Sequence, residues 1–66
     1  MELGRYRHYK NIEVEVIGSA KHSETLEEMV VYRHLDTKEL WVRPKIMFEE
    51  TVEYQGRKVP RFAFIK

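Results

Sequence analysis

The sequence predicts an all-β fold, namely a small SH3-like antiparallel barrel of about five strands with one short 3₁₀ or α turn. Two observations favour this class. Short runs rich in Val, Ile, Tyr, Phe and Trp are separated by turn residues every few positions, and no part of the chain requires an interior helix. Residues 28–34 carry bulky side chains on both faces of a strand, which is typical of a sheet that curls.

Length and composition indicate one small domain over residues 1–66. A chain of this length buries only about 60% of the surface that it exposes when unfolded, so its core must be small. Charged residues make up 35% of the chain, but the net charge is only +1. A charge so close to zero argues against strong non-specific binding to nucleic acid, although a local basic patch stays possible.

The sequence lacks the features of disulfide-bonded, membrane-spanning and secreted proteins. The chain has no cysteine, no apolar run of membrane-spanning length and no signal-peptide pattern at its start. The gaps between His8, His22 and His34 fit no zinc spacing. We therefore expect a cytoplasmic protein without membrane association, disulfide, cofactor or metal site.

The first strand is expected at residues 5–10, with Tyr6 and His8 on one face. Its interleaved basic and aromatic side chains are typical of two structures, a surface that follows nucleic acid and an edge strand protected by positive charge. The edge strand is the more common of the two. Asn11, which tolerates left-handed backbone dihedrals, then predicts a turn.

The next strand is expected at residues 12–16, where apolar and acidic side chains alternate strictly. The two glutamates face solvent, and such a pair usually serves solubility rather than chemistry. Residues 18–20, with the sequence Gly-Ser-Ala, predict the end of this strand. The inward residues are Ile12, Val14 and Val16.

A central strand is expected at residues 28–34, because its β-branched and aromatic residues disfavour a helix. Residues 35–39 form a polar connection of hairpin length, and residues 40–43 follow as the return strand. Pro44 cannot donate to a ladder and ends that strand. A helical turn at residues 44–48 is expected to place its apolar side chains in the core.

The register of the last hairpin follows from its turn, Tyr54-Gln55-Gly56-Arg57, which has Gly at the second central position. Counting outward gives one apolar pair and two opposite-charge pairs, and each contributes roughly 0.2–1 kcal/mol. The predicted pairs are Val52 with Val59, Glu53 with Lys58 and Glu50 with Arg61. Pro60 predicts an edge or a bulge at that end of the hairpin.

The candidate site lies at the turn before the central strand, where His22, Ser23, Glu24 and Thr25 are adjacent. A catalytic relay is not expected there, because neighbouring residues point to opposite sides and such relays join distant segments. We therefore assign no catalytic residue. Two interpretations stay open: a ligand site, or a cap in which Ser23 and Thr25 accept backbone N–H groups, with Thr25 and Glu28 at capping-box spacing.

Tyr32, Trp41 and Arg43 complete the candidate ligand-binding set. If the strands that carry them form a hairpin, Trp41 and Arg43 are expected beside the turn at residues 22–25. Together these residues would form a shallow aromatic and cationic surface. A barrel of this size cannot enclose a ligand, so a peptide or a nucleic acid is the expected partner.

If the protein binds a ligand, Arg43 is expected to contribute more to that function than His22. The following Pro44 biases Arg43 toward an extended conformation. Its planar guanidinium suits two roles, an anion receptor or an internal clamp on Glu24 or Glu27. The clamp is the favoured role.

Several segments of the chain carry a resemblance to a known family. They are Tyr6-Arg7-His8-Tyr9-Lys10, Ala20-Lys21-His22-Ser23-Glu24-Thr25-Leu26-Glu27, Val30-Val31-Tyr32-Arg33, Trp41-Val42-Arg43-Pro44, Met47-Phe48 and Val59-Pro60-Arg61-Phe62. Together they resemble the bacterial domain-of-unknown-function family 1653. The resemblance implies a small SH3-like β-barrel in a bacterial cytoplasm, and it implies no activity. Asn11 and Val14 depart from the family's pattern, where Gly and Tyr are expected.

Three functions compete on this sequence. The first is a binding module that uses the aromatic and cationic surface. The second is a structural or assembly unit that pairs through exposed strand edges. The expected oligomeric state is a monomer or a weak homodimer. The third, and least favoured, is a small enzyme with His22 as base, because a deep pocket is not expected at this size.

Overall fold

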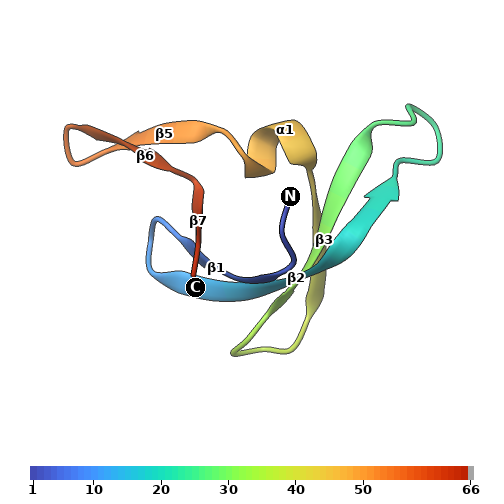
Figure 1. Cartoon of the computed structure of the whole chain (residues 1–66), viewed down its shortest axis with the longest axis horizontal. Coiled ribbons are helices and arrows are strands. Elements are labelled where there is room, and N and C mark those ends of the chain that lie inside the picture. The colour runs from blue at the N-terminus through green and yellow to red at the C-terminus, as the bar shows by residue number, and fades with distance from the viewer. Residues whose placement is uncertain (66) are drawn as a thin grey trace.

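The computed structural model describes residues 1–65, and it shows a mainly β fold (Figure 1). Within these residues, five strands form an antiparallel sheet, two form a separate hairpin and one helical turn joins them. No helix in the described chain has the length and hydropathy needed to span a membrane. The elements in chain order are β1 (Gly4–His8), β2 (Ile12–Lys21), β3 (Glu28–His34), β4 (Leu40–Pro44), α1 (Lys45–Phe48), β5 (Thr51–Tyr54), β6 (Arg57–Pro60) and β7 (Phe62–Phe64).

The sheet has the strand order β4-β3-β2-β1-β7. Consecutive hairpins build it from β1 to β4, and β7 returns to pair with β1, so that Tyr6 lies opposite Phe64. The strand predicted to be central, β3, is an interior strand between β2 and β4. Among residues 1–65 no strand pairing joins β4 to β7, which leaves the curled sheet with two open edges.

The predicted end of the second strand at residues 18–20 is wrong, because β2 continues to Lys21. The register against β3 shifts between Val16 and Gly18, so Ile17 is an extra residue that forms a β-bulge. A bulge bends the strand and increases its twist without ending the pairing. The glycine and the small residues after it therefore mark a bend in the sheet. Ile12, which was expected inward, is 39% exposed.

Two turns follow their sequence patterns. Asn11 adopts a φ of 68° between β1 and β2, in the left-handed region that the sequence predicts. In the β5–β6 hairpin, Gln55 and Gly56 have φ values of 53° and 77°, as a type I′ turn requires.

The predicted register of that hairpin is confirmed, with Val52 opposite Val59 and Glu53 opposite Lys58. Beyond the ladder, the Arg61 guanidinium forms an ion pair with the Glu50 carboxylate, which is the third predicted pair. After Arg61 the chain leaves the hairpin and enters β7.

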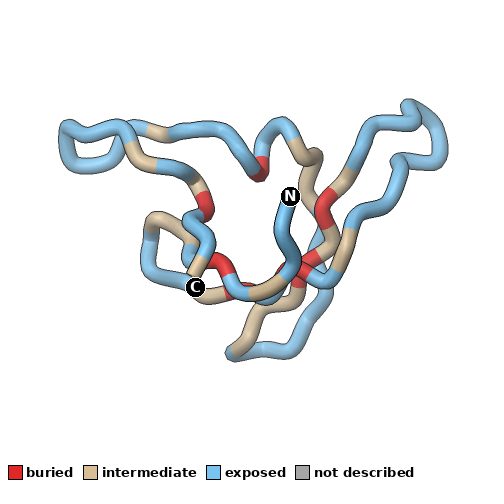
Figure 2. The backbone as a smooth tube through the Cα atoms, viewed as in Figure 1, coloured by how far each residue is buried: buried red, intermediate tan, exposed pale blue. Residues whose placement is uncertain are grey.

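Among the described residues, seven buried residues form one hydrophobic core, and the buried positions, drawn in red, lie around the middle of the molecule in Figure 2. The helical turn α1 contributes only Phe48 to it, because Ile46 is 74% exposed and Met47 is 42% exposed. The expectation that all the apolar side chains of this turn are buried is therefore wrong. The core residues are Tyr6, Val14, Val16, Val30, Tyr32, Phe48 and Phe62.

Candidate functional site

The turn that joins β2 to β3 is held by its own side chains. His22 Nδ1 accepts the backbone N–H groups of Glu24 and Thr25, at 3.1 and 3.3 Å, and Thr25 Oγ1 accepts that of Glu27 at 3.2 Å. The cap interpretation is thus correct for Thr25, but the main acceptor is His22 and not Ser23. With its Nδ1 committed to the backbone and its side chain exposed, His22 has a structural role in this turn.

The structure does not bring this turn and Trp41 together. Trp41 pairs with Tyr32, and its ring packs against His34 with ring centroids 5.0 Å apart, at the C-terminal end of β3. The turn at residues 22–25 precedes the N-terminal end of β3, so the two turns that flank this strand lie at opposite ends of it (Figure 1). The expected single surface is therefore wrong.

Tyr32, Trp41 and Arg43 do come together, around a cleft of about 190 Å³ that we call the seam cleft. Both open edges of the sheet contribute to it, through Arg43 of β4 and Phe62 of β7. Its walls are largely aromatic, with Tyr32 5.7 Å from Phe62 between ring centroids. The lining residues are His8, Ile12, Val14, Tyr32, His34, Trp41, Arg43 and Phe62.

Arg43 lies in the seam cleft without an acidic partner. The Cζ atom is 5.9 Å from the centroid of the Phe62 ring, in a cation–π contact. The Nε atom is buried and has no hydrogen-bond partner in the described chain. Arg43 takes part in none of the ion pairs formed within residues 1–65, so the expected clamp on Glu24 or Glu27 is wrong. The Nε nitrogen is therefore a donor that a water molecule or an external anion can accept from.

The pKa of His8 depends on the charged groups around the cleft. Its pKa is lowered from the ordinary value, first by burial and then by the charges of Arg43, Arg61, Lys10 and His34. The groups whose charges lower the pKa of His8 all belong to basic side chains, so basic residues gather at this end of the cleft although the net charge of the chain is only +1. A lowered pKa makes the imidazole neutral at pH 7. Its Nδ1 atom accepts the Lys10 N–H at 3.2 Å, which assigns the proton to Nε2.

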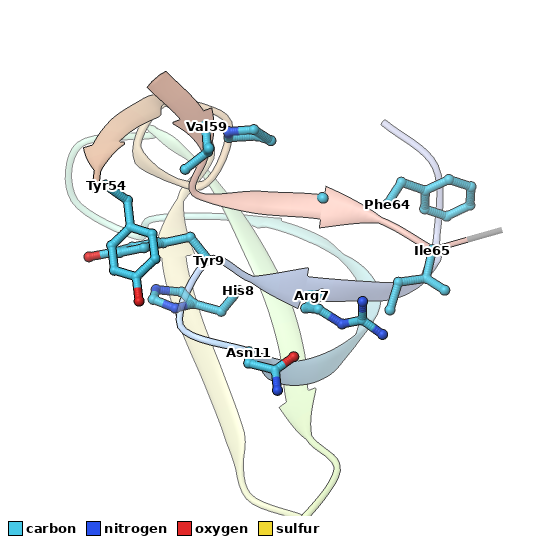
Figure 3. A pocket seen from close by; sticks show the side chains of 10 residues that line it. Arg7, His8, Tyr9, Asn11, Tyr54, Val59, Phe64 and Ile65 are labelled. Atoms are coloured by element: carbon cyan, nitrogen blue, oxygen red, sulfur yellow. The ribbon is translucent and has the colours of Figure 1, made fainter. Parts of the chain in front are cut away.

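A second, more apolar groove lies beside the seam cleft, between the β1–β7 edge and the β5–β6 hairpin (Figure 3). It has a volume of about 410 Å³. Tyr9 and Tyr54 meet in it edge to face, with ring centroids 5.2 Å apart. His8 lines both depressions. The lining residues are Arg7, His8, Tyr9, Asn11, Tyr54, Val59, Pro60, Ala63, Phe64 and Ile65.

The sequence alone does not indicate that His8, His34 or Phe62 belongs to a site. These residues come from three different strands and meet only when the sheet curls, so their spacing in the sequence carries no signal. The one available signal was the basic and aromatic interleaving at residues 5–10. In residues 1–65 no three His, Asp or Glu side chains gather as metal ligands, and the expected lack of a metal site stays a prediction.

Comparison with known proteins identifies two similarities. A model of the family described as protein of unknown function (DUF1653) matches residues 4–64. The chain is also similar to a crystal structure of a DUF1653 protein from Bordetella bronchiseptica, with 34% sequence identity and a TM-score of 0.91. That match covers 98% of this chain and 87% of the other. No curated protein matches significantly.

Proposed function

The chain belongs to the DUF1653 family, and from the geometry of the seam cleft we propose that it is a binding module for single-stranded nucleic acid. The observation that carries the proposal is the position of Arg43. Its buried Nε has no acceptor in the described chain and lies in a cleft with largely aromatic walls, where basic side chains surround His8. An aromatic platform combined with cationic groups is the usual way in which proteins hold single strands.

Trp41 provides the stacking surface. Its side chain is 48% exposed although it lines the cleft, which leaves part of the indole free for a ligand. Stacking of a base on an aromatic side chain contributes about 1–3 kcal/mol. The cleft is smaller than the roughly 300–1,000 Å³ typical of small-molecule pockets, so it suits one ring-sized group such as a base.

Arg43 provides the contact to phosphate. The guanidinium is planar and presents N–H groups in a fixed fork that matches a phosphate or a carboxylate. Lys10, whose charge also lowers the pKa of His8, adds a second basic side chain near Arg43. This local patch supports binding to a polyanion despite the low net charge.

The groove at Tyr9 and Tyr54 supports a ligand longer than one nucleotide. It shares His8 with the seam cleft, and it offers a second pair of aromatic rings. An extended strand that places one base near Trp41 can place a following base near Tyr54. We therefore expect affinity to rise with length over the first few nucleotides.

We also propose that the curled sheet is an SH3-like, partly open barrel and that the protein works in the cytoplasm. The strand order and the helical turn between β4 and the following strands support the first proposal. A sequence without cysteine supports the second. The role of His22 in its turn gives no support to an enzymatic function.

Fluorescence titration tests the proposal, because Trp41 is the one tryptophan of the chain. Oligonucleotides of one to six nucleotides are added at low and at raised salt. We expect quenching of Trp41, tighter binding with length and weaker binding at raised salt. The test variant is Arg43→Ala, which removes the cation of the cleft. The control variant is Arg33→Ala, which removes a cation from the face of β3 opposite to Tyr32.

Two results would contradict the proposal. One is equal affinity of Arg33→Ala and Arg43→Ala for the oligonucleotides. The other is binding of acidic peptides in the cleft while oligonucleotides leave the Trp41 fluorescence unchanged. The second result would assign the same cleft to a peptide.

A further inference from the structure

The outer edge of β4 presents backbone hydrogen-bonding groups that no described strand uses. His34 N–H donates to Glu39 O on the β4 side, whereas Leu35 N–H donates to Glu13 O on the β2 side. Backbone groups of an antiparallel strand alternate in direction. By the register of the two strands, Trp41 and Arg43 bond to β3, so the N–H and C=O groups of Leu40 and Val42 point away from the sheet.

The residue that follows fits this assignment. Pro44 has the same parity as Leu40 and Val42, so its backbone nitrogen also lies on the outer side. Proline has no N–H to donate and is found in sheets almost only where no ladder bond is needed. Its position opposite Met29 is therefore compatible with an outer edge.

The same edge is apolar. Leu40 is 60% exposed, Val42 is 59% exposed and Trp41 is 48% exposed. Exposed edge strands are usually protected by a lysine, a bulge or a covering segment. Residues 40–42 carry no charge, and β4 lies at the end of the sheet as far as the structure describes the chain. Such an edge pairs readily with another strand.

We propose that β4 pairs with β4 of a second copy of this chain, antiparallel and about a two-fold axis at Val42. Val42 is the middle residue of β4, so an axis there overlaps the whole strand. The Val42 groups of the two copies then bond to each other reciprocally, and each Leu40 N–H donates to the Pro44 C=O of the second copy. The missing N–H of Pro44 leaves only the Leu40 C=O to water.

The side chains are complementary in this register. Trp41 lies directly opposite Arg43 of the second copy, and a guanidinium over an indole is the most favourable cation–π pair. Each Arg43 is then placed between Phe62 of its own chain and Trp41 of the second copy. The second copy thereby covers the mouth of the seam cleft, so dimer formation and oligonucleotide binding compete for Trp41 and Arg43.

The interface is small, because one strand from each copy forms most of it. Interfaces below about 1,200 Å² are typical of weak, transient association. The dimer is therefore expected to form over a concentration range of about 10 µM to 1 mM, where sedimentation velocity measures it. The wild-type sedimentation coefficient should rise across this range.

Val42 variants separate edge pairing from any other contact. Val42→Pro removes an N–H that β3 does not use, and Val42→Lys places like charges opposite each other on the axis. Both should stay monomeric. The matched control, Val42→Thr, keeps the N–H and the β-branched shape and should dimerise like the wild type. A wild type that is monomeric at 1 mM, or a Val42→Lys variant that dimerises like Val42→Thr, overturns the proposal.

Amide hydrogen exchange tests the wild-type protein itself, so the result does not depend on the folding of a variant. The Leu40 and Val42 amides should exchange more slowly as concentration rises, while the Trp41 amide, already bonded to β3, should not change. A dimer without this protection has another interface and refutes the pairing. The register is read from single-cysteine variants: Val42→Cys should form the intermolecular disulfide faster than Leu40→Cys, and equal rates contradict an axis at Val42.

Discussion

Phe48 and Phe62 stack face to face, with ring centroids 4.1 Å apart and an angle of 4° between the ring planes. The first ring comes from α1 and the second from β7. Both rings also contact Tyr32, with centroid distances of 5.6 and 5.7 Å. The stack therefore packs the helical turn and the C-terminal strand against β3, and it fixes the Phe62 ring on which Arg43 lies.

Replacing Phe48 by Ala should lower the free energy of unfolding by about 3–5 kcal/mol, because the side chain is 1% exposed and its removal leaves a cavity. A loss of this size is comparable to the whole stability of many small domains. Urea denaturation followed by circular dichroism measures it. The control on the same helical turn is Ile46→Ala, which should change stability by less than about 0.5 kcal/mol, since Ile46 is 74% exposed. Equal effects of the two variants would contradict the packing described here.

Gly56→Ala and Gly18→Ala test the effect of backbone conformation, because an added methyl group has room at both positions. An added Cβ meets no atom within 4 Å at either position, but only Gly56 has a positive φ, of 77°. Gly56→Ala should therefore cost about 1–2 kcal/mol of the free energy of unfolding. Gly18→Ala should be neutral or slightly stabilising. Thermal denaturation of both variants gives the comparison, and a larger loss at Gly18 would show that the bulge needs glycine.

The lowered pKa of His8 predicts a loss of stability in acid. Below the ordinary histidine pKa of about 6.5, the unfolded chain binds a proton at this side chain that the folded chain resists. Unfolding free energy therefore stays constant above that pH with respect to His8 and falls as the pH drops below it. His8→Asn keeps an acceptor for the Lys10 N–H and should flatten the curve between pH 7 and 5, whereas His22→Gln should keep the contribution of His8. Urea denaturation at each pH measures this, and an unchanged slope in His8→Asn would refute the assignment.

Arg43→Lys and His22→Ala should separate binding from stability. Lysine keeps the charge but loses the planar fork, so oligonucleotide affinity should fall about tenfold while stability changes little. His22→Ala removes two hydrogen bonds that hold a turn, and it should lower stability by about 0.5–1 kcal/mol without changing affinity. Fluorescence titration and thermal denaturation of both variants decide the ranking. Loss of affinity in His22→Ala alone would reverse it.

Much of the secondary structure could be predicted, because it depends on local chemistry. Asn11 and Gly56 mark their turns through dihedral angles that few other residues adopt. The cross-strand pairs of the last hairpin define its register. A slip of one residue would separate the opposite charges and would expose both Val52 and Val59. The local pattern failed at residues 18–20, because glycine and other small residues are typical both of a β-bulge and of the end of a strand.

The seam cleft could be predicted only in part. Tyr32, Trp41 and Arg43 lie on neighbouring strands of one hairpin, and alternation places them on a common face. His8 and Phe62 arrive through the pairing of β1 with β7, which no local pattern specifies. The turn at residues 22–25 was misplaced relative to Trp41 because the strands of a hairpin run antiparallel. Trp41 pairs with Tyr32 near the C-terminal end of β3, whereas the turn precedes Glu28 at the other end.

The pairing of β1 with β7 has a consequence for the rate of folding. Every other ladder joins strands that are neighbours in sequence, but this one brings Tyr6 to Phe64. Closing so long a loop costs more chain entropy than closing a hairpin, and non-local contacts slow folding. The hairpins should therefore form first, and the Phe48–Phe62 stack should form only when β7 docks. If β7 docks after the rate-limiting barrier, Phe62→Leu should speed unfolding and leave the folding rate almost unchanged in stopped-flow experiments, so the ratio of its two rate changes gives the order of these steps.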